Sequence, residues 1–306
     1  MFREAAGFSL ALFSMVLYGL YMVPRKRSKV SQSTYTFWMG CGILIGTTLI
    51  GAVSGGIAHV TLAQYLLIFF CGVFWATGTD AYCRAVRYIG LSRSTPIKNT
   101  SAFLGMLCGI IAFHEFSARS GASLVLVIVG SVAVTGSAVL LGRVEANGAE
   151  KGKASRRKLV LGVLCSMWAA IAYSAYTIPM KIAYQQGVSP SAFLFYMGQG
   201  CFVGMVLMAL LGGFRPAPKL VTWYDRNLAL ISGAMWALGS LCANIAVKLI
   251  GIAITWPLTK NTVVAVVYGA FVLREIDVMR HRRNLSYGLA LSVIGVILLA
   301  LATGRG

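Results

Sequence analysis

The chain contains the same segment twice, and this duplication restricts its possible folds more than any other feature. VLYGLYMVPRK begins at Val16, and its copy IAYSAYTIPMK begins at Ile171. Four more blocks follow in the same order in both halves, about 160 residues apart: Phe37–Gly40 with Phe195–Gly198, Trp75–Gly78 with Trp236–Gly239, Gly90–Pro96 with Gly251–Pro257, and Gly109–Glu115 with Gly269–Glu275. Blocks that recur in this order indicate a duplicated structural unit.

The composition places the duplicated unit in a membrane. Hydrophobic residues make up 58% of the chain and charged residues 11%, whereas soluble domains carry about 25% charged residues. About 20 apolar residues cross a bilayer core of about 30 Å. The predicted fold is an all-α membrane protein with ten transmembrane helices, five in each copy, at 7–24, 34–55, 61–86, 93–113, 121–142, 159–180, 191–212, 227–247, 252–272 and 285–303.

The basic residues predict the orientation, because lysines and arginines in short loops stay on the cytoplasmic side. Twenty of the 27 lie in loops after odd-numbered spans, and five lie on the other side. The predicted location is the cell (inner) membrane. Both termini are predicted to lie on its outer side, opposite the cytoplasm. Since each copy has five spans, the second copy enters upside down. We expect two inverted five-helix repeats, 1–142 and 159–306, joined by a cytoplasmic linker at 143–158.

Several function classes are disfavoured. The net charge of +19 is spread over short loops, which does not indicate nucleic-acid binding. The seven cysteines lie in or beside apolar spans without a CxxC pair, and the chain has no Walker loop, HExxH or GxSxG with partners. We expect no enzyme, catalytic residue, cofactor or metal. The expected partners are the lipid bilayer and a small-molecule substrate, with protons and a homodimer left open.

Polar residues inside the fourth and ninth spans predict a binding site. An ionisable group within a span costs on the order of 3 kcal/mol, so it usually faces a cavity or a partner. In each of these two spans a lysine and an asparagine follow a proline, Pro96 or Pro257, which removes a helical hydrogen bond. The predicted substrate-binding residues here are Lys98, Asn99, Lys260 and Asn261. For Lys98, snorkelling to the nearby cytoplasmic end is the alternative.

Three carboxylates lie in or at the ends of spans. Asp80 stands one helical turn before Arg84, so it forms either a structural ion pair or a proton-coupling site. Glu115 and Glu275 end the fourth and ninth spans and are predicted to be interface residues, with a gating role as the alternative.

Aromatic residues occupy equivalent points of both halves. Trp75 corresponds to Trp236, and Tyr18 corresponds to Tyr173. Such rings stack on the apolar face of a sugar while phenol hydroxyls hydrogen-bond. We add all four to the candidate substrate site, together with Asn244 as a hydrogen-bonding residue. Interface anchoring or helix packing is the alternative role for the aromatic rings.

The stretch from Trp75 to Glu115 resembles the glucose/ribose uptake (sugar permease) family of the drug/metabolite transporter superfamily. The residues that carry the resemblance are Trp75, Ala76 and Gly78 of W-A-x-G, then Ile89–Ile97 of I-G-[LV]-S-[KR]-[ST]-x-P-I, then Gly109, Phe113, His114 and Glu115 of G-x-x-x-F-H-E. The resemblance extends over all ten spans. It implies proton-driven sugar import by alternating access. Related rhamnose/proton symporters are similar in having ten spans and outward termini.

One departure from that family opens an alternative. Where the family has small polar residues after the proline, this chain has Lys98-Asn99-Thr100. A cationic side chain in each half suggests an anionic substrate such as an organic acid or sugar phosphate. A non-transporting membrane sensor is a further possibility, which would fit if both lysines were paired with acids. The mechanism expected for a transporter is rocking of the two halves around a midplane site.

Overall fold

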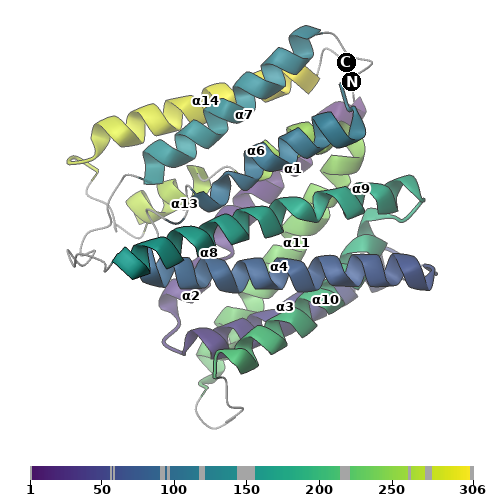
Figure 1. The fold of residues 1–306 in the computed structure, drawn as a ribbon, viewed down its shortest axis with the longest axis vertical. Coiled ribbons are helices and arrows are strands. Elements are labelled where there is room, and N and C mark those ends of the chain that lie inside the picture. The colour runs from purple at the N-terminus through teal and green to yellow at the C-terminus, as the bar shows by residue number, and fades with distance from the viewer. Residues whose placement is uncertain are drawn as a thin grey trace.

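The structure is a computed structural model, and within its described part every regular element is a helix (Figure 1). The described residues are 2–55, 57, 59–89, 94, 97–116, 121–142, 156–213, 221–260, 263–272 and 278–303. The first half contains α1 (Phe2–Leu20), α2 (Val23–Arg27), α3 (Gln32–Val53), α4 (Leu62–Ile89), α6 (Ser101–Leu107), the π-helix η1 (Cys108–Ala112) and α7 (Gly121–Gly142).

The second half repeats this order. It contains α8 (Arg156–Ala175), α9 (Thr177–Gln185), α10 (Pro190–Leu211), α11 (Trp223–Ile250), α12 (Ile252–Thr259), α13 (Val263–Val267), the π-helix η3 (Tyr268–Val272) and α14 (Arg282–Thr303). α1 begins and α14 ends at one end of the bundle, which we call the termini-bearing end (Figure 1). α7 ends and α8 begins at the opposite, linker-bearing end.

Eight of the ten predicted spans are helices that are long and apolar enough to cross a membrane. They are Phe2–Arg25, Gln32–Val53, Leu62–Ala85, Gly121–Leu141, Arg156–Gln185, Pro190–Leu211, Trp223–Ile250 and Arg282–Thr303. The chain is therefore a multi-pass membrane protein whose described residues form an all-helical fold.

The other two predicted spans are built from shorter pieces. Residues 97–112 form a shorter apolar helix whose last five residues are π-helical. α12 contains Pro257, ends at Thr259 and is followed by a turn at Lys260. Because proline lacks the N–H group that a helix interior uses, a break close to it is expected. Pro96 lies outside the described residues.

The helices of one half pack mainly against those of the other. α4 packs against α8 and α10, and α11 packs against α1 and α3, so each contact has a counterpart with the halves exchanged. α7 and α14 lie side by side along one edge of the bundle, while α3 and α10 pair at the opposite edge (Figure 1). α6 packs against α12 near the middle.

Repeat-related glycines make the same close approach in both halves. A Cβ atom at Gly42 would overlap the backbone of Leu230, and one at Gly200 would overlap the backbone of Phe69. Leu230 and Phe69 are themselves equivalent, because each stands six residues before the tryptophan of the W-A-x-G block. Small residues at these points let α3 approach α11, and α10 approach α4, at backbone distance.

Candidate functional site

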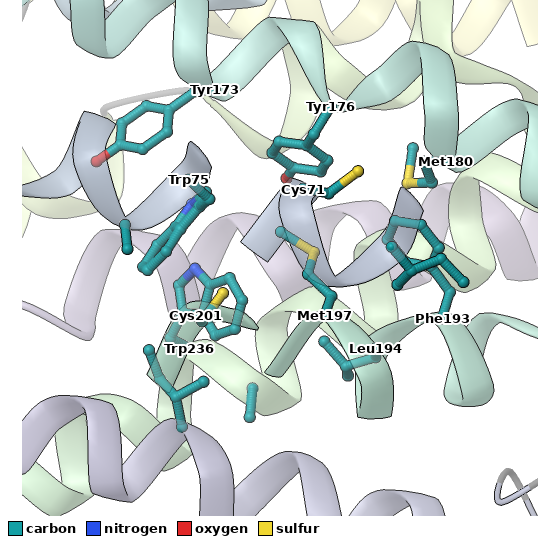
Figure 2. Close-up of a cluster of buried hydrophobic side chains, with 14 of the residues drawn as sticks. Cys71, Trp75, Tyr173, Tyr176, Met180, Phe193, Leu194, Met197, Cys201 and Trp236 are labelled. Carbon is teal, nitrogen blue, oxygen red and sulfur yellow. The ribbon is translucent and has the colours of Figure 1, made fainter. Parts of the chain in front are cut away.

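Two repeat-related tryptophans meet at the centre of the bundle. Trp75 and Trp236 stand at mid-length of α4 and α11, which have 28 residues each. Their ring centroids are 4.4 Å apart with an interplanar angle of 43°, and each residue is 3% exposed. The Tyr173 ring lies 6.0 Å from the Trp75 ring, and Figure 2 shows the three side chains grouped together. The structure therefore brings both predicted tryptophans and Tyr173 to one place.

Two equivalent hydrogen bonds flank the tryptophan pair. The hydroxyl of Tyr18 shares a hydrogen bond of 2.8 Å with the Ser240 hydroxyl, and that of Tyr173 shares one of 3.0 Å with Thr79. Ser240 and Thr79 follow the tryptophans by four residues, which places them on the same helix face. The sequence analysis missed both residues, although their spacing from the repeated tryptophans was available as a signal.

The two lysines converge on the same tyrosines. The Nζ atom of Lys260 lies 4.6 Å from the centroid of the Tyr18 ring and 6.0 Å from that of Tyr173. The Nζ atom of Lys98 lies 6.0 Å from the Tyr173 ring and 5.0 Å from the Tyr82 ring. Both lysines are half-buried. Cations over aromatic faces are attracted by the ring quadrupole, which offsets part of the cost of removing them from water.

No carboxylate neutralises these lysines among the described residues. The ion pairs Asp80 with Arg84 and Glu115 with Lys181 include neither Lys98 nor Lys260. Two ammonium groups that share one tyrosine ring repel each other in a medium of low dielectric constant. An acceptor or anionic group that enters between them would be stabilised by both.

Several buried polar atoms close to these residues in sequence have no hydrogen-bond partner within the described part of the chain. They are both amide atoms of Asn99, Nδ2 of Asn244, Oγ1 of Thr255 and Nε1 of Trp256. Asn99 is 1% exposed, and the Trp256 ring lies 5.0 Å from the Lys260 Nζ atom. Because buried polar groups are nearly always hydrogen-bonded, these atoms are available to a bound polar molecule.

Two predicted residues do not join the cluster of tyrosines and lysines. Asp80 forms an ion pair with Arg84, with 2.6 Å between Oδ2 and Nε, so it takes the intrahelical partner that the spacing allowed. Asn261 lies outside the described residues. The sequence analysis also missed Tyr82 and Trp256; Trp256 directly precedes the repeated proline, whereas Tyr82 carried no signal.

The fold and the site together define a multi-pass membrane protein with a polar, aromatic centre assembled from both halves of the chain. The model of the family described as Sugar transport protein matches residues 8–302, and the chain belongs to this family.

Relatives in several bacteria agree with this assignment. A protein of Lactiplantibacillus plantarum named for sugar uptake is 25% identical over 85% of this chain and 88% of its own length. A protein of Priestia megaterium named for glucose uptake, GlcU, is 27% identical over 76% of this chain and 77% of its own length. A protein of Listeria innocua named for sugar uptake is 26% identical over 96% of this chain and 98% of its own length.

A solved crystal structure has the same fold. It superposes with a TM-score of 0.72 and covers 98% of both chains at 14% sequence identity. At that identity the likeness concerns the fold alone.

Proposed function

We propose that this protein is a secondary active transporter that moves a sugar across the cell membrane by alternating access. Two inverted five-helix repeats, residues 1–142 and 159–306, would rock about a shared centre, with a cytoplasmic linker at 143–158 and both termini outside. Support comes from the repeated sequence blocks, from the exchanged packing of α4 and α11, and from the sugar transport family. The proposal includes membership of the drug/metabolite transporter superfamily and a relation to rhamnose/proton symporters.

The observation that carries the proposal is the meeting of repeat-related side chains at helix mid-length. Trp75 and Trp236 would stack on a sugar ring after separating from each other, as aromatic faces do on apolar sugar faces. Tyr18, Tyr173 and the amides of Asn99, Asn244 and Asn261 would supply hydrogen bonds. Lys98 and Lys260 would donate to sugar hydroxyls. A site built from both halves changes its exposure when the halves rock.

Proton coupling is proposed at Asp80. This carboxylate is adjacent in α4 to Thr79, whose hydroxyl bonds Tyr173, so a change of its charge on protonation would act close to the central site. In proteoliposomes, Asp80→Asn should abolish the stimulation of uptake by an inward proton gradient while exchange of substrate without a gradient continues. Arg84→Gln is the matched control, since it removes the partner but keeps the carboxylate. Accumulation that remains gradient-dependent in Asp80→Asn would show that the coupling site lies elsewhere.

A second candidate substrate class is an anionic metabolite, either an organic acid or a sugar phosphate. The specific observation in its favour is the pair of half-buried ammonium groups around Tyr173 without a carboxylate partner among the described residues. Charge-assisted hydrogen bonds to a carboxylate or phosphate are about twice as strong as neutral ones, so such a substrate would use both lysines.

Uptake into proteoliposomes distinguishes the candidates. The panel pairs neutral sugars with their carboxylated and phosphorylated analogues, with and without an inward proton gradient. Gradient-stimulated uptake of a neutral sugar supports the first proposal. Selective uptake of the anionic analogues, reduced at least about tenfold in Lys260→Ala and in Lys98→Ala, supports the second. No flux of any compound in protein that is folded would contradict both and favour a non-transporting sensor.

A further inference from the structure

Glu115 occupies an unusual backbone position at the end of the fourth predicted span. It follows η1, in which the wider π-helical turn interrupts the α-helical register. His114 has φ of 50°, in the left-handed region that non-glycine residues seldom adopt. The Glu115 N–H then donates to the Gly109 carbonyl at 3.3 Å. This sharp turn brings the Glu115 side chain back across the boundary between the two halves.

Among the described residues, the Glu115 carboxylate accepts from three donors of the second half. Its Oε1 atom accepts from the Ile252 N–H at 3.0 Å and from the Lys181 Nζ atom at 2.8 Å, and its Oε2 atom accepts from the Ala253 N–H at 2.9 Å. The side chain is 10% exposed. The two N–H groups are at the beginning of α12, where a carboxylate satisfies otherwise unpaired donors and complements the helix dipole.

Two glycines make room for this carboxylate. A Cβ atom at Gly109 or at Gly251 would overlap the Glu115 carboxylate, so a side chain at either position would displace it. Gly251 also has φ of 89°, a conformation that glycine adopts without strain. The local structure of both halves is therefore adapted to hold Glu115 at the start of α12.

The contact is linked to the central site through one short helix. α12 has eight residues; it begins at the Glu115 carboxylate, carries Trp256 and is followed directly by Lys260. Movement of its first turn would therefore be transmitted to the lysine that lies over Tyr18.

The contact lies at the termini-bearing end, where Figure 1 places α9, the helix that carries Lys181. Buried apolar side chains fill the core between the centre and this end. In Figure 2 Met180 and Phe193 lie on one side, Tyr173 and Trp75 on the other, and Cys71 and Tyr176 between them. All six are buried.

We propose that Glu115 is a gating residue: its bonds to Lys181 and to the start of α12 hold the termini-bearing end closed, and their rupture opens the path to the centre from that side. The name gate rests on the proposed transport function. The contact itself joins the two halves whether or not a substrate moves.

Native Cys71 reports on this opening without any substrate. It is 5% exposed in the closed arrangement. We would reconstitute the purified protein in nanodiscs and follow alkylation of Cys71 by a polar maleimide, using peptide mass spectrometry. Glu115→Gln removes the charge with little change in shape and should raise the alkylation rate about tenfold, as expected for loss of charge-assisted hydrogen bonds. Lys181→Met should act in the same direction and provides a second variant if Glu115→Gln is poorly folded.

Two comparison variants make the test specific to one end. Gln64→Ala removes an exposed hydrogen bond of 3.2 Å between α4 and Gln186, which also joins the halves, and should leave the rate unchanged. At the linker-bearing end, the Ser28 hydroxyl donates to the Asp225 carboxylate at 2.8 Å, and Asp225→Asn weakens this contact. This variant should alkylate at the wild-type rate or more slowly. Wild-type rates in both Glu115→Gln and Lys181→Met would overturn the proposal. An equal rise in Asp225→Asn would also overturn it, because that result means general loosening. Faster alkylation of Cys71 in Glu115→Gln and Lys181→Met, together with no flux in the uptake panel, would support the Glu115 contact as the closure of this end and would contradict the transport proposal.

Discussion

The two ends of the bundle are built on the same repeated scaffold but differ in chemistry. Ser232 and Cys71 are equivalent, because each stands four residues before the repeated tryptophan. Tyr35 and Phe193 are equivalent, because each stands two residues before the repeated block that begins at Phe37 and at Phe195. At the linker-bearing end, the buried Tyr35 hydroxyl bonds the Ser232 hydroxyl at 2.5 Å. At the termini-bearing end, the equivalent Phe193 ring has no hydroxyl and the Cys71 thiol donates to the Leu67 carbonyl of its own helix. Tyr35, Cys71 and Phe193 all belong to one buried apolar cluster, so the ends differ in this cross-helix hydrogen bond.

This difference indicates which end separates more easily. Water can replace a protein hydrogen bond, so each one contributes a net of only about 0.5–1.5 kcal/mol. Apolar surface has no such replacement and costs about 25 cal/mol per Å² when water reaches it. We therefore expect the linker-bearing end to hydrate readily, and the termini-bearing end to stay packed until Glu115 is released. In the proposed alternating access, the repeat of the two halves would supply the symmetry between the two states, and divergence of the side chains would set the preference between them.

The largest effect is expected from Phe193→Ala at the apolar end. Phe193 is 0% exposed and packs against Tyr184, with 5.6 Å between the ring centroids. Loss of the ring leaves a cavity that costs about 3–5 kcal/mol. Tyr35→Phe, at the equivalent position of the other end, removes only the hydroxyl that bonds Ser232 and should cost far less, because the ring remains. Thermal unfolding in detergent would measure both, and equal losses of stability would contradict the difference between the ends.

Ser232→Ala should have the next largest effect. The Ser232 hydroxyl donates to the Tyr21 carbonyl at 2.5 Å and accepts from Tyr35, so its removal leaves two buried groups unpaired. The expected loss is about 1–3 kcal/mol of unfolding free energy. Cys71→Ser places the Ser232 side chain at the equivalent position of the other end. Its loss of unfolding free energy should be smaller, because the new hydroxyl can donate to the Leu67 carbonyl as the Cys71 thiol does. A larger loss for Cys71→Ser would contradict the hydrogen-bonding account.

The smallest effects are expected at the centre, where the halves remain alike. Tyr18→Phe leaves the Ser240 hydroxyl without its partner and should cost about 1 kcal/mol. Tyr173→Phe should cost less, because Thr79 also donates to the Trp75 carbonyl at 3.2 Å. Unfolding of both variants beside wild type tests the order, and a reversal would contradict the compensation that the bond from Thr79 to the Trp75 carbonyl is expected to provide.

The parts of the site that could be predicted are those fixed by the repeat. Because the halves are duplicated, residues at matching positions of α4 and α11 are expected to meet near the centre, and Trp75 and Trp236 do. The convergence of Lys98 and Lys260 was predicted for the same reason. For Asp80 the spacing predicted an ion pair with Arg84, which the structure contains, while proton coupling at the same carboxylate stays a prediction.

Other features depended on contacts that spacing does not reveal. Glu115 was predicted to be an interface residue, with gating as the alternative, but its partners could not be named, since Lys181 and the start of α12 are 66 or more positions away in the chain. Pro96 and Pro257 predicted a lost helical hydrogen bond in the fourth and ninth spans, but the positions of the breaks could not be predicted, because hydropathy measures apolar content and not helical register. A turn at Lys260 and a π-helix at 108–112 leave the composition of a span unchanged.

The sequence by itself determined that the chain is an apolar membrane protein with repeated sequence blocks. Hydrophobic content and the order of the blocks can both be read along the chain without knowledge of any tertiary contact. Only the tertiary structure decided which partner each buried polar group takes. Burial removes water as an alternative partner, so the choice depends on which atoms the packed helices bring within about 3 Å. At Glu115 the packing of α9 and α12 supplies those atoms, and at Lys98 and Lys260 it supplies aromatic rings and no carboxylate among the described residues.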